Sequence, residues 1–318
     1  MTPNSRRRLV AAAIGGLLTI TACSSDGEDT VSSQDSLDAA TPDEDDVTEV
    51  GEAESTFEEP TSNDVDCSDE GLGADDMISF TAAHHVVDGE LGALCNGAGD
   101  ERIFEAWDAL ATIAPRGQLG DLGVFTAFEE SGAGDEITLA FVQPLDADGT
   151  VFQMSINLDE YEFDPDEALL TMAHEFSHVF TATPAQIDRS VEAAETCTTY
   201  DNGEGCFLED SLIFQWVDTF WVDYIDDFDP FVEASGVEGE QRCSEDAGFL
   251  GPYAASNPEE DFAESFSAYV FDVEAATPEQ QERLDWMADQ PGLVEFHERA
   301  VAAGLTPVRN GFEVCGVG

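Results

Sequence analysis

Two histidines and a glutamate form a short motif whose residue types could bind and use a metal ion. The motif is His174-Glu175-Phe176-Ser177-His178, with its histidines four residues apart. On a helix, residues four apart share one face, so both imidazoles can reach the same ion. The Glu175 carboxylate would then lie beside the ion, close to a water molecule that the ion activates. The spacing is typical of a zinc-dependent peptidase.

The residues around the motif predict the helix that it needs. Asp164 is a good N-cap residue, and Pro165 suits the first helical position. Glu167 stands three residues after the cap, as a capping box requires. Apolar residues then recur at helical spacing, so we expect a helix over Asp164–Thr181.

A second stretch, Tyr253–Tyr269, could supply the third ligand that a zinc ion held by two histidines still needs. Asn257-Pro258 predicts the start of a helix there. Glu260 and Glu264 are four residues apart, so they share one face of that helix. From the residues alone, either glutamate could be the ligand.

The two stretches together resemble the lethal-factor-like zinc metallopeptidases, which are gluzincins. The resemblance lies in the H-E-F-S-H motif and in a tyrosine seven residues before the first glutamate of an E-x-F-A-E helix, and it covers about residues 150–270. It implies that His174, His178 and Glu260 bind Zn²⁺. It also implies that Glu264 contacts a zinc-bound histidine without binding the metal, and that Tyr253 helps to stabilise the transition state. Glu264 remains the alternative to Glu260 as the third ligand.

One part of the matched region departs from that family. The stretch between His178 and Glu260 is longer than the family pattern and contains three cysteines, Cys197, Cys206 and Cys243. Even so, the resemblance implies an α+β fold, a zincin-like metallopeptidase domain with a small β-sheet, an active-site helix and a mostly helical C-terminal lobe.

The residues before the motif helix are expected to form helices and then a sheet. Residues 75–114 look helical in two pieces, the second being Glu101–Ile113. His84-His85 falls in the first piece, and adjacent residues point apart on a helix, so we do not assign them to a metal. Residues 122–158 resemble a β-meander with strands Gly123–Phe128, Ile137–Val142 and Val151–Leu158.

An acidic turn in this region could be mistaken for a calcium loop. Asp146-Ala147-Asp148-Gly149 has some of the acidic spacing, but Asn157 stands where a calcium loop needs a glutamate. A hairpin turn is the better interpretation.

The C-terminal part predicts helices and little chemistry. Asp210–Tyr224 is an aromatic helical segment that we expect in the core, and residues 228–251 look like a loop. Thr277 begins a capping box, and a last helix over Pro291–Ala303 is closed by a glycine. His297 is interpreted as a surface or packing residue.

The N-terminus predicts export and a lipid anchor. Residues 1–22 have a basic start and a short apolar run, as in a signal peptide, and end before Cys23 in a sequence similar to a bacterial lipobox. Residues 23–66 are acidic and poor in large apolar side chains, so we expect a disordered linker. Residues 67–318 would be the catalytic domain.

The remaining cysteines are even in number, which agrees with an oxidising compartment. Proximity in the sequence favours Cys67–Cys95 and Cys197–Cys206, which leaves Cys243–Cys315, although fifteen pairings are possible. None of the cysteine spacings is that of a zinc site, so no second metal is assigned to them.

The charge of the chain restricts its partners. It has 10 Lys+Arg against 70 Asp+Glu and a formal net charge of −60. Such a field argues against binding to nucleic acid or to anionic lipid surfaces. Salt would screen the self-repulsion, so a salty habitat is a hypothesis.

These observations predict an extracytoplasmic zinc endopeptidase, anchored to the membrane through a lipid on Cys23. The substrate would be an extended or unfolded polypeptide lying antiparallel to the free edge of the strand Val151–Leu158. The alternative is a non-catalytic, zinc-stabilised binding lipoprotein on the cell surface. Glu175 favours the peptidase, because a structural site has no need for a base.

Overall fold

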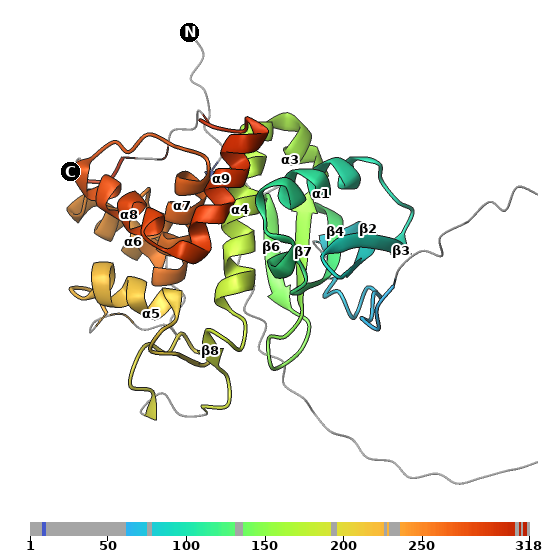
Figure 1. The fold of residues 1–318 in the computed structure, drawn as a ribbon, viewed down its shortest axis with the longest axis horizontal. Helices are drawn as coiled ribbons and strands as arrows, with labels where there is room; N and C mark the ends of the chain where they lie inside the picture. Colours follow the sequence, from blue (N-terminus) through green and yellow to red (C-terminus); the bar gives the residue numbers. More distant parts are fainter. Residues whose placement is uncertain are drawn as a thin grey trace, which may run out of the picture. The chain divides into compact units, whose positions relative to one another are not determined.

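The α+β class predicted from the sequence is confirmed. The computed structural model describes residues 8–10, 62–74, 78–130, 136–191, 196–225, 228, 236–308, 312 and 314–316. Figure 1 shows a small mixed sheet on one side of helix α4 and a group of helices from the C-terminal part on the other. The predicted signal peptide, apart from residues 8–10, and Cys23 lie outside the described residues.

The prediction of a helix at the start of the domain is wrong. Residues 78–97 form a hairpin of β2 (Ile78–Val87) and β3 (Glu90–Gly97). The turn between them is Asp88-Gly89, and both residues have positive φ, 52° and 72°. Two-residue hairpin turns of this kind require positive φ and favour Asp-Gly, so the signal for the hairpin was present in the sequence.

The prediction of a β-meander is also wrong. The sheet has the order β3-β2-β4-β7-β6, in which β4 (Leu122–Glu130) and β7 (Phe152–Asn157) are parallel neighbours. The intervening β6 (Ala140–Pro144) pairs antiparallel with β7 on its other side. Strand β7 is therefore paired on both sides, and β6 is the edge strand at this end of the sheet.

The turn between β6 and β7 is a hairpin loop, as predicted. It passes through Asp146 and Gly149, and the Asp146 carboxylate accepts the backbone N–H of Thr150 at 2.8 Å. Just before β6, the short strand β5 (Glu136–Thr138) pairs in parallel with β1 (Arg8–Val10).

Helices precede and follow the sheet. Helix α1 (Arg102–Ile113) confirms the second predicted helix, and α2 (Arg116–Leu119) follows it. A short helix, α3 (Leu158–Phe163), stands between β7 and the motif helix α4 (Pro165–Thr181). The predicted N-cap is present, since the Asp164 carboxylate accepts the N–H of Glu167 at 3.2 Å.

The C-terminal part is mainly helical. Its elements are β8 (Ile187–Asp188), β9 (Cys206–Phe207), α5 (Leu212–Trp216), a π-helical turn (Val217–Trp221), α6 (Gly236–Glu245), a 3₁₀ turn (Ala254–Ser256), α7 (Pro258–Val270), α8 (Pro278–Ala288) and α9 (Pro291–Ala303). Helix α6 corrects the expectation of a loop over residues 228–251. The expected caps at Asn257 and Thr277 are present, and Gly304 ends α9 in the left-handed conformation.

Helix α4 contacts the sheet on one side and the C-terminal helices on the other. Phe180 of α4 packs against Phe266 of α7 and Phe296 of α9, with ring centroids 5.3 and 5.6 Å apart. This aromatic core fixes α4 against α7, so it fixes the distance between the motif and any ligand on α7.

Three disulfides join the pairs favoured by proximity: Cys67–Cys95, Cys197–Cys206 and Cys243–Cys315. Asn63 lies within the stretch predicted to be a linker, yet its side chain donates to the carbonyl oxygens of Val86 and Gly123. Within the described residues, no helix has the length and apolar character needed to cross a membrane.

Candidate metal centre

Helix α4 places the two motif histidines side by side. Both project from the same face, and their Nε2 atoms are 3.3 Å apart. His174 is almost fully buried and His178 is mostly buried. Two ring nitrogens this close cannot hydrogen-bond well to each other unless one is protonated, whereas both lone pairs can bind one cation.

Helix α7 brings Glu260 to the same point. Its Oε2 lies 2.9 Å from Nε2 of His174 and 3.6 Å from Nε2 of His178. This oxygen is buried and has no hydrogen bond of good geometry. Ligand atoms bound at about 2.0–2.1 Å to one tetrahedral ion lie roughly 3.3 Å apart, so the three donors fit a single metal ion. These residues could hold a metal ion, and the geometry does not identify which one.

Glu264 contacts the other side of His174. Its Oε1 lies 3.1 Å from Nδ1, one helical turn beyond Glu260. A carboxylate at Nδ1 accepts the proton there and leaves Nε2 with a free lone pair directed at Glu260 and His178. The geometry therefore separates the two glutamates, with Glu260 among the possible ligands and Glu264 behind one of them.

The carboxylates make the site favourable for positive charge. Burial alone would lower the pKa of His174, but Glu260 and Glu264 raise it well above its ordinary value. Burial would likewise raise the pKa of Glu260, but His178 and His174 lower it below its ordinary value. The same attraction that favours a proton here would favour a metal cation.

Glu175 lies next to the possible ligands without joining them. Its side chain is 1% exposed, and one carboxylate oxygen, Oε1, has no hydrogen-bond partner among the described residues. Burial raises the pKa of Glu175 to about 7, although the imidazoles of His174 and His178 oppose the shift. A carboxyl group with a pKa near neutrality can both take up and release a proton.

Tyr253 also lies at the site. Its ring stacks on His174 with centroids 5.8 Å apart. Burial and the carboxylates of Glu260 and Glu175 raise the pKa of Tyr253 well above its ordinary value, so the phenol keeps its proton and can donate it in a hydrogen bond. The 3₁₀ turn that follows Tyr253, Ala254–Ser256, is held by Arg242 of α6, whose guanidinium donates to the carbonyl oxygens of Ala255 and Ser256.

Asp261 is a residue of this region that the sequence did not reveal. It is fully buried, and its Oδ2 accepts the indole N–H groups of Trp216 and Trp221, each at 2.9 Å. Arg283 of α8 donates to the same carboxylate at 3.2 Å. Through Asp261, the residue that follows Glu260, this network links α7 to the Leu212–Trp221 segment and to α8. The aromatic run was visible in the sequence, but its partner was not.

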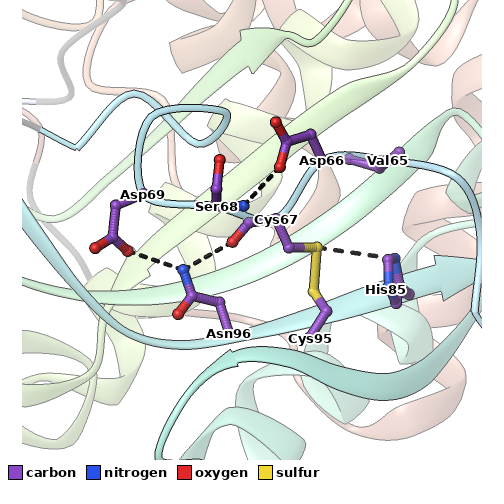
Figure 2. A pocket seen from close by; sticks show the side chains of 8 residues that line it. All are labelled: Val65, Asp66, Cys67, Ser68, Asp69, His85, Cys95 and Asn96. Atoms are coloured by element: carbon purple, nitrogen blue, oxygen red, sulfur yellow. Dashed lines mark hydrogen bonds between the residues drawn. A yellow bond between two sulfur atoms is a disulfide. The ribbon is translucent and has the colours of Figure 1, made fainter. Parts of the chain in front are cut away.

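A second group of residues that could hold a metal ion lies on the sheet. Figure 2 shows Cys67, Cys95 and His85 together at the pocket between the 62–74 segment and strands β2 and β3. Here the two sulfur atoms are joined in a disulfide, with Sγ of Cys67 3.8 Å from Nδ1 of His85. A disulfide does not supply thiolate ligands, so this group could bind a metal only after reduction.

The remaining histidines have partners elsewhere. His84 contacts the carbonyl oxygen of Gly92, and His297 pairs with Asp272 at 2.8 Å and stacks on Tyr269. The contacts of His297 agree with the surface or packing role expected for it, whereas His84 lies in β2 and not in the expected helix.

Comparison of the chain with protein-family models, curated proteins and solved structures finds no match. The function has to be argued from the chemistry of the chain's own residues.

Proposed function

We propose that this protein is a zinc-dependent endopeptidase with a zincin-like catalytic domain, similar to the lethal-factor-like gluzincins. The observation that carries the proposal is a buried Glu175 carboxyl group beside three converging metal ligands, His174, His178 and Glu260. A site that only stabilises the fold has no use for this extra carboxylate, whose burial costs free energy.

The residues divide the chemistry among them. Zn²⁺ bound by these ligands would act as a Lewis acid and make a coordinated water more acidic. Glu175 would accept a proton at its unpartnered oxygen and later donate it to the leaving amine. The Tyr253 hydroxyl would donate a hydrogen bond to the oxyanion that develops on the scissile carbonyl.

The substrate would lie along β6 rather than along β7, which was the predicted strand. In the antiparallel β6–β7 pair, Asn157 N–H bonds to Leu139 O and Leu145 N–H bonds to Val151 O. Hydrogen-bonded and non-hydrogen-bonded pairs alternate along such a ladder. Every second residue of β6, including Val142, therefore directs its backbone groups away from β7. An extended polypeptide could add to this edge, and β6 contacts α4.

The proposed location is extracytoplasmic, with a lipid anchor on Cys23. The signal-like sequence before Cys23 supports export, and the three disulfides agree with an oxidising compartment. The strongly negative charge argues against nucleic acid as a partner.

Replacing the base tests the proposal most directly. Glu175→Gln keeps the size of the side chain and removes the proton acceptor, so turnover of an unfolded polypeptide should fall by about 10²–10⁴-fold. Zinc content, measured by metal analysis, should remain at one ion per chain. A chelator should abolish the wild-type activity, and added zinc should restore it.

The alternative proposal is a non-catalytic, zinc-stabilised binding lipoprotein. It would be favoured if zinc-loaded protein cleaved nothing in a broad panel of unfolded polypeptides and if Glu175→Gln changed no cellular phenotype. Zinc content alone does not separate the two proposals, because both require the metal.

A further inference from the structure

Helix α7 begins with three consecutive carboxylates, Glu259, Glu260 and Asp261, and each has a different partner. Successive residues of an α-helix point about 100° apart, so the three side chains leave the helix in different directions. Glu260 points at the histidines of α4, and Asp261 points at the tryptophans and Arg283. The partner of Glu259 lies in a third direction.

That partner is Tyr200, which lies in the hairpin of residues 197–207 that ends with β9. The Tyr200 hydroxyl donates to Oε2 of Glu259 at 3.1 Å. Burial and the Glu259 carboxylate raise the pKa of Tyr200 well above its ordinary value, so the hydroxyl remains a donor.

The hairpin is firmly held. Tyr200 is 4% exposed, and its ring stacks on Phe207 with centroids 5.6 Å apart and planes 7° apart. The disulfide Cys197–Cys206 closes the hairpin, and the N–H of Phe207 donates to the carbonyl oxygen of Tyr200. A rigid donor can hold its acceptor in place, whereas a mobile loop could not.

The first turn of a helix lacks part of the hydrogen bonding that stabilises its middle, and it tends to fray. In α7 this turn contains Glu260. The turn is fixed on one side by Tyr200 through Glu259 and on the other by the Asp261 network, with Asn257 as the cap. Two anchors in different directions restrict rotation of the helix about its axis, so the direction of Glu260 is restricted too.

We propose that Tyr200 is a positioning residue of the metal centre, which holds the first turn of α7 so that Glu260 meets His174 and His178. The inference rests on the metal site of the proposed function. It also gives a role to the hairpin, which lies in the stretch that is longer than the family pattern. Among its described contacts, Tyr200 touches neither the donor atoms of the proposed ligands nor Glu175.

The test compares two tyrosines that make the same kind of bond. Tyr200→Phe removes the hydroxyl next to α7. Tyr224→Phe removes a hydroxyl that donates to Asp246 at 2.9 Å and makes no described hydrogen bond to α7. Zinc dissociation constants would be measured by competition with a chromophoric chelator, and unfolding of the metal-free proteins by denaturant titration.

Tyr200→Phe should weaken zinc binding by about 3- to 10-fold, the range expected for loss of one net hydrogen bond. Tyr224→Phe should leave zinc binding unchanged, even if both variants lose similar stability. Unchanged zinc affinity in Tyr200→Phe, or equal losses in the two variants, would overturn the inference.

A double-mutant cycle checks the route through Glu259. Glu259→Leu removes the acceptor, so adding Tyr200→Phe to it should cost little further zinc affinity. A full additional loss would mean that Tyr200 acts in another way. If the wild-type protein bound no zinc at all, the proposed metal centre itself would fail, which is a different outcome from a failure of the positioning role.

Discussion

At the residue scale, the two nitrogens of His174 have different surroundings. Nδ1 faces Glu264 at 3.1 Å, and Nε2 faces Glu260 at 2.9 Å. The first contact fixes where the ring carries its proton, and the second lies among the possible ligands. The two glutamates therefore have different expected roles although they share one helix face.

Removing each glutamate should separate these roles. Glu260→Ala removes a proposed ligand and should lose most of the metal. Glu264→Ala leaves all three proposed ligands in place and should weaken metal binding less, by about 10–100-fold. Metal content after dialysis against a graded series of chelator concentrations would measure both. A larger loss in Glu264→Ala would move the ligand to Glu264.

At the scale of elements, α7 depends on a buried charge. Asp261 and Arg283 are both almost fully buried, and Arg283 lies over the rings of Phe220 and Phe249. Removing one partner of a buried pair leaves the other without compensation.

Asp261→Ala should therefore lower the free energy of unfolding by about 3–5 kcal/mol. Denaturant titration of the metal-free protein would measure this loss. Asp285→Ala is the matched control, because Asp285 is exposed on α8 and, among the described residues, its side chain accepts only from Gln281. Its effect should stay within about 0.5 kcal/mol. Similar effects of the two variants would contradict a structural role for the network.

The edge of β6 makes a second prediction at this scale. Val142→Pro removes an N–H that points away from β7, and proline is tolerated at such edge positions. It should lower kcat/KM for an extended polypeptide by about 3- to 10-fold, with zinc content unchanged. Val142→Ala keeps the N–H and controls for lost packing. An equal loss in both variants would show that the edge does not bind substrate.

At the scale of the whole molecule, negative charge is in large excess. The described arginine side chains are already engaged: Arg102, Arg116, Arg189, Arg283 and Arg299 pair with carboxylates, and Arg242 binds backbone carbonyl oxygens. They are few against 70 Asp+Glu, so most carboxylates repel one another without a local counter-charge.

Salt should therefore stabilise the protein. Screening shortens the reach of the repulsion from about 10 Å at 0.1 M to about 3 Å at 1 M salt. Tm should rise between these concentrations of sodium chloride, by about 2–4 °C for each kcal/mol of repulsion removed. Chloride is preferable to sulfate, which stabilises most proteins by exclusion from their surfaces. A flat Tm would remove the hypothesis of adaptation to salt.

The sequence alone determined the features that depend on local chemistry. The caps at Asp164, Asn257 and Thr277 were predictable because each bonds to a backbone N–H only three residues away. The shared face of His174 and His178 and the closest disulfide pairs were predictable because they too join residues that are near in the sequence. The Asp88-Gly89 turn is equally local, so the β2–β3 hairpin was also predictable from the sequence, although we expected a helix there.

The tertiary structure decided everything that depends on long-range pairing. The sequence gives no local sign that β4 would pair with β7, or that β6 would become the edge, because strand order depends on how the whole sheet packs against α4. Likewise, Glu259, Glu260 and Asp261 are three similar acidic residues in the sequence. Only the folded chain gives them different partners, because Tyr200, the motif histidines and the tryptophans approach α7 from different directions.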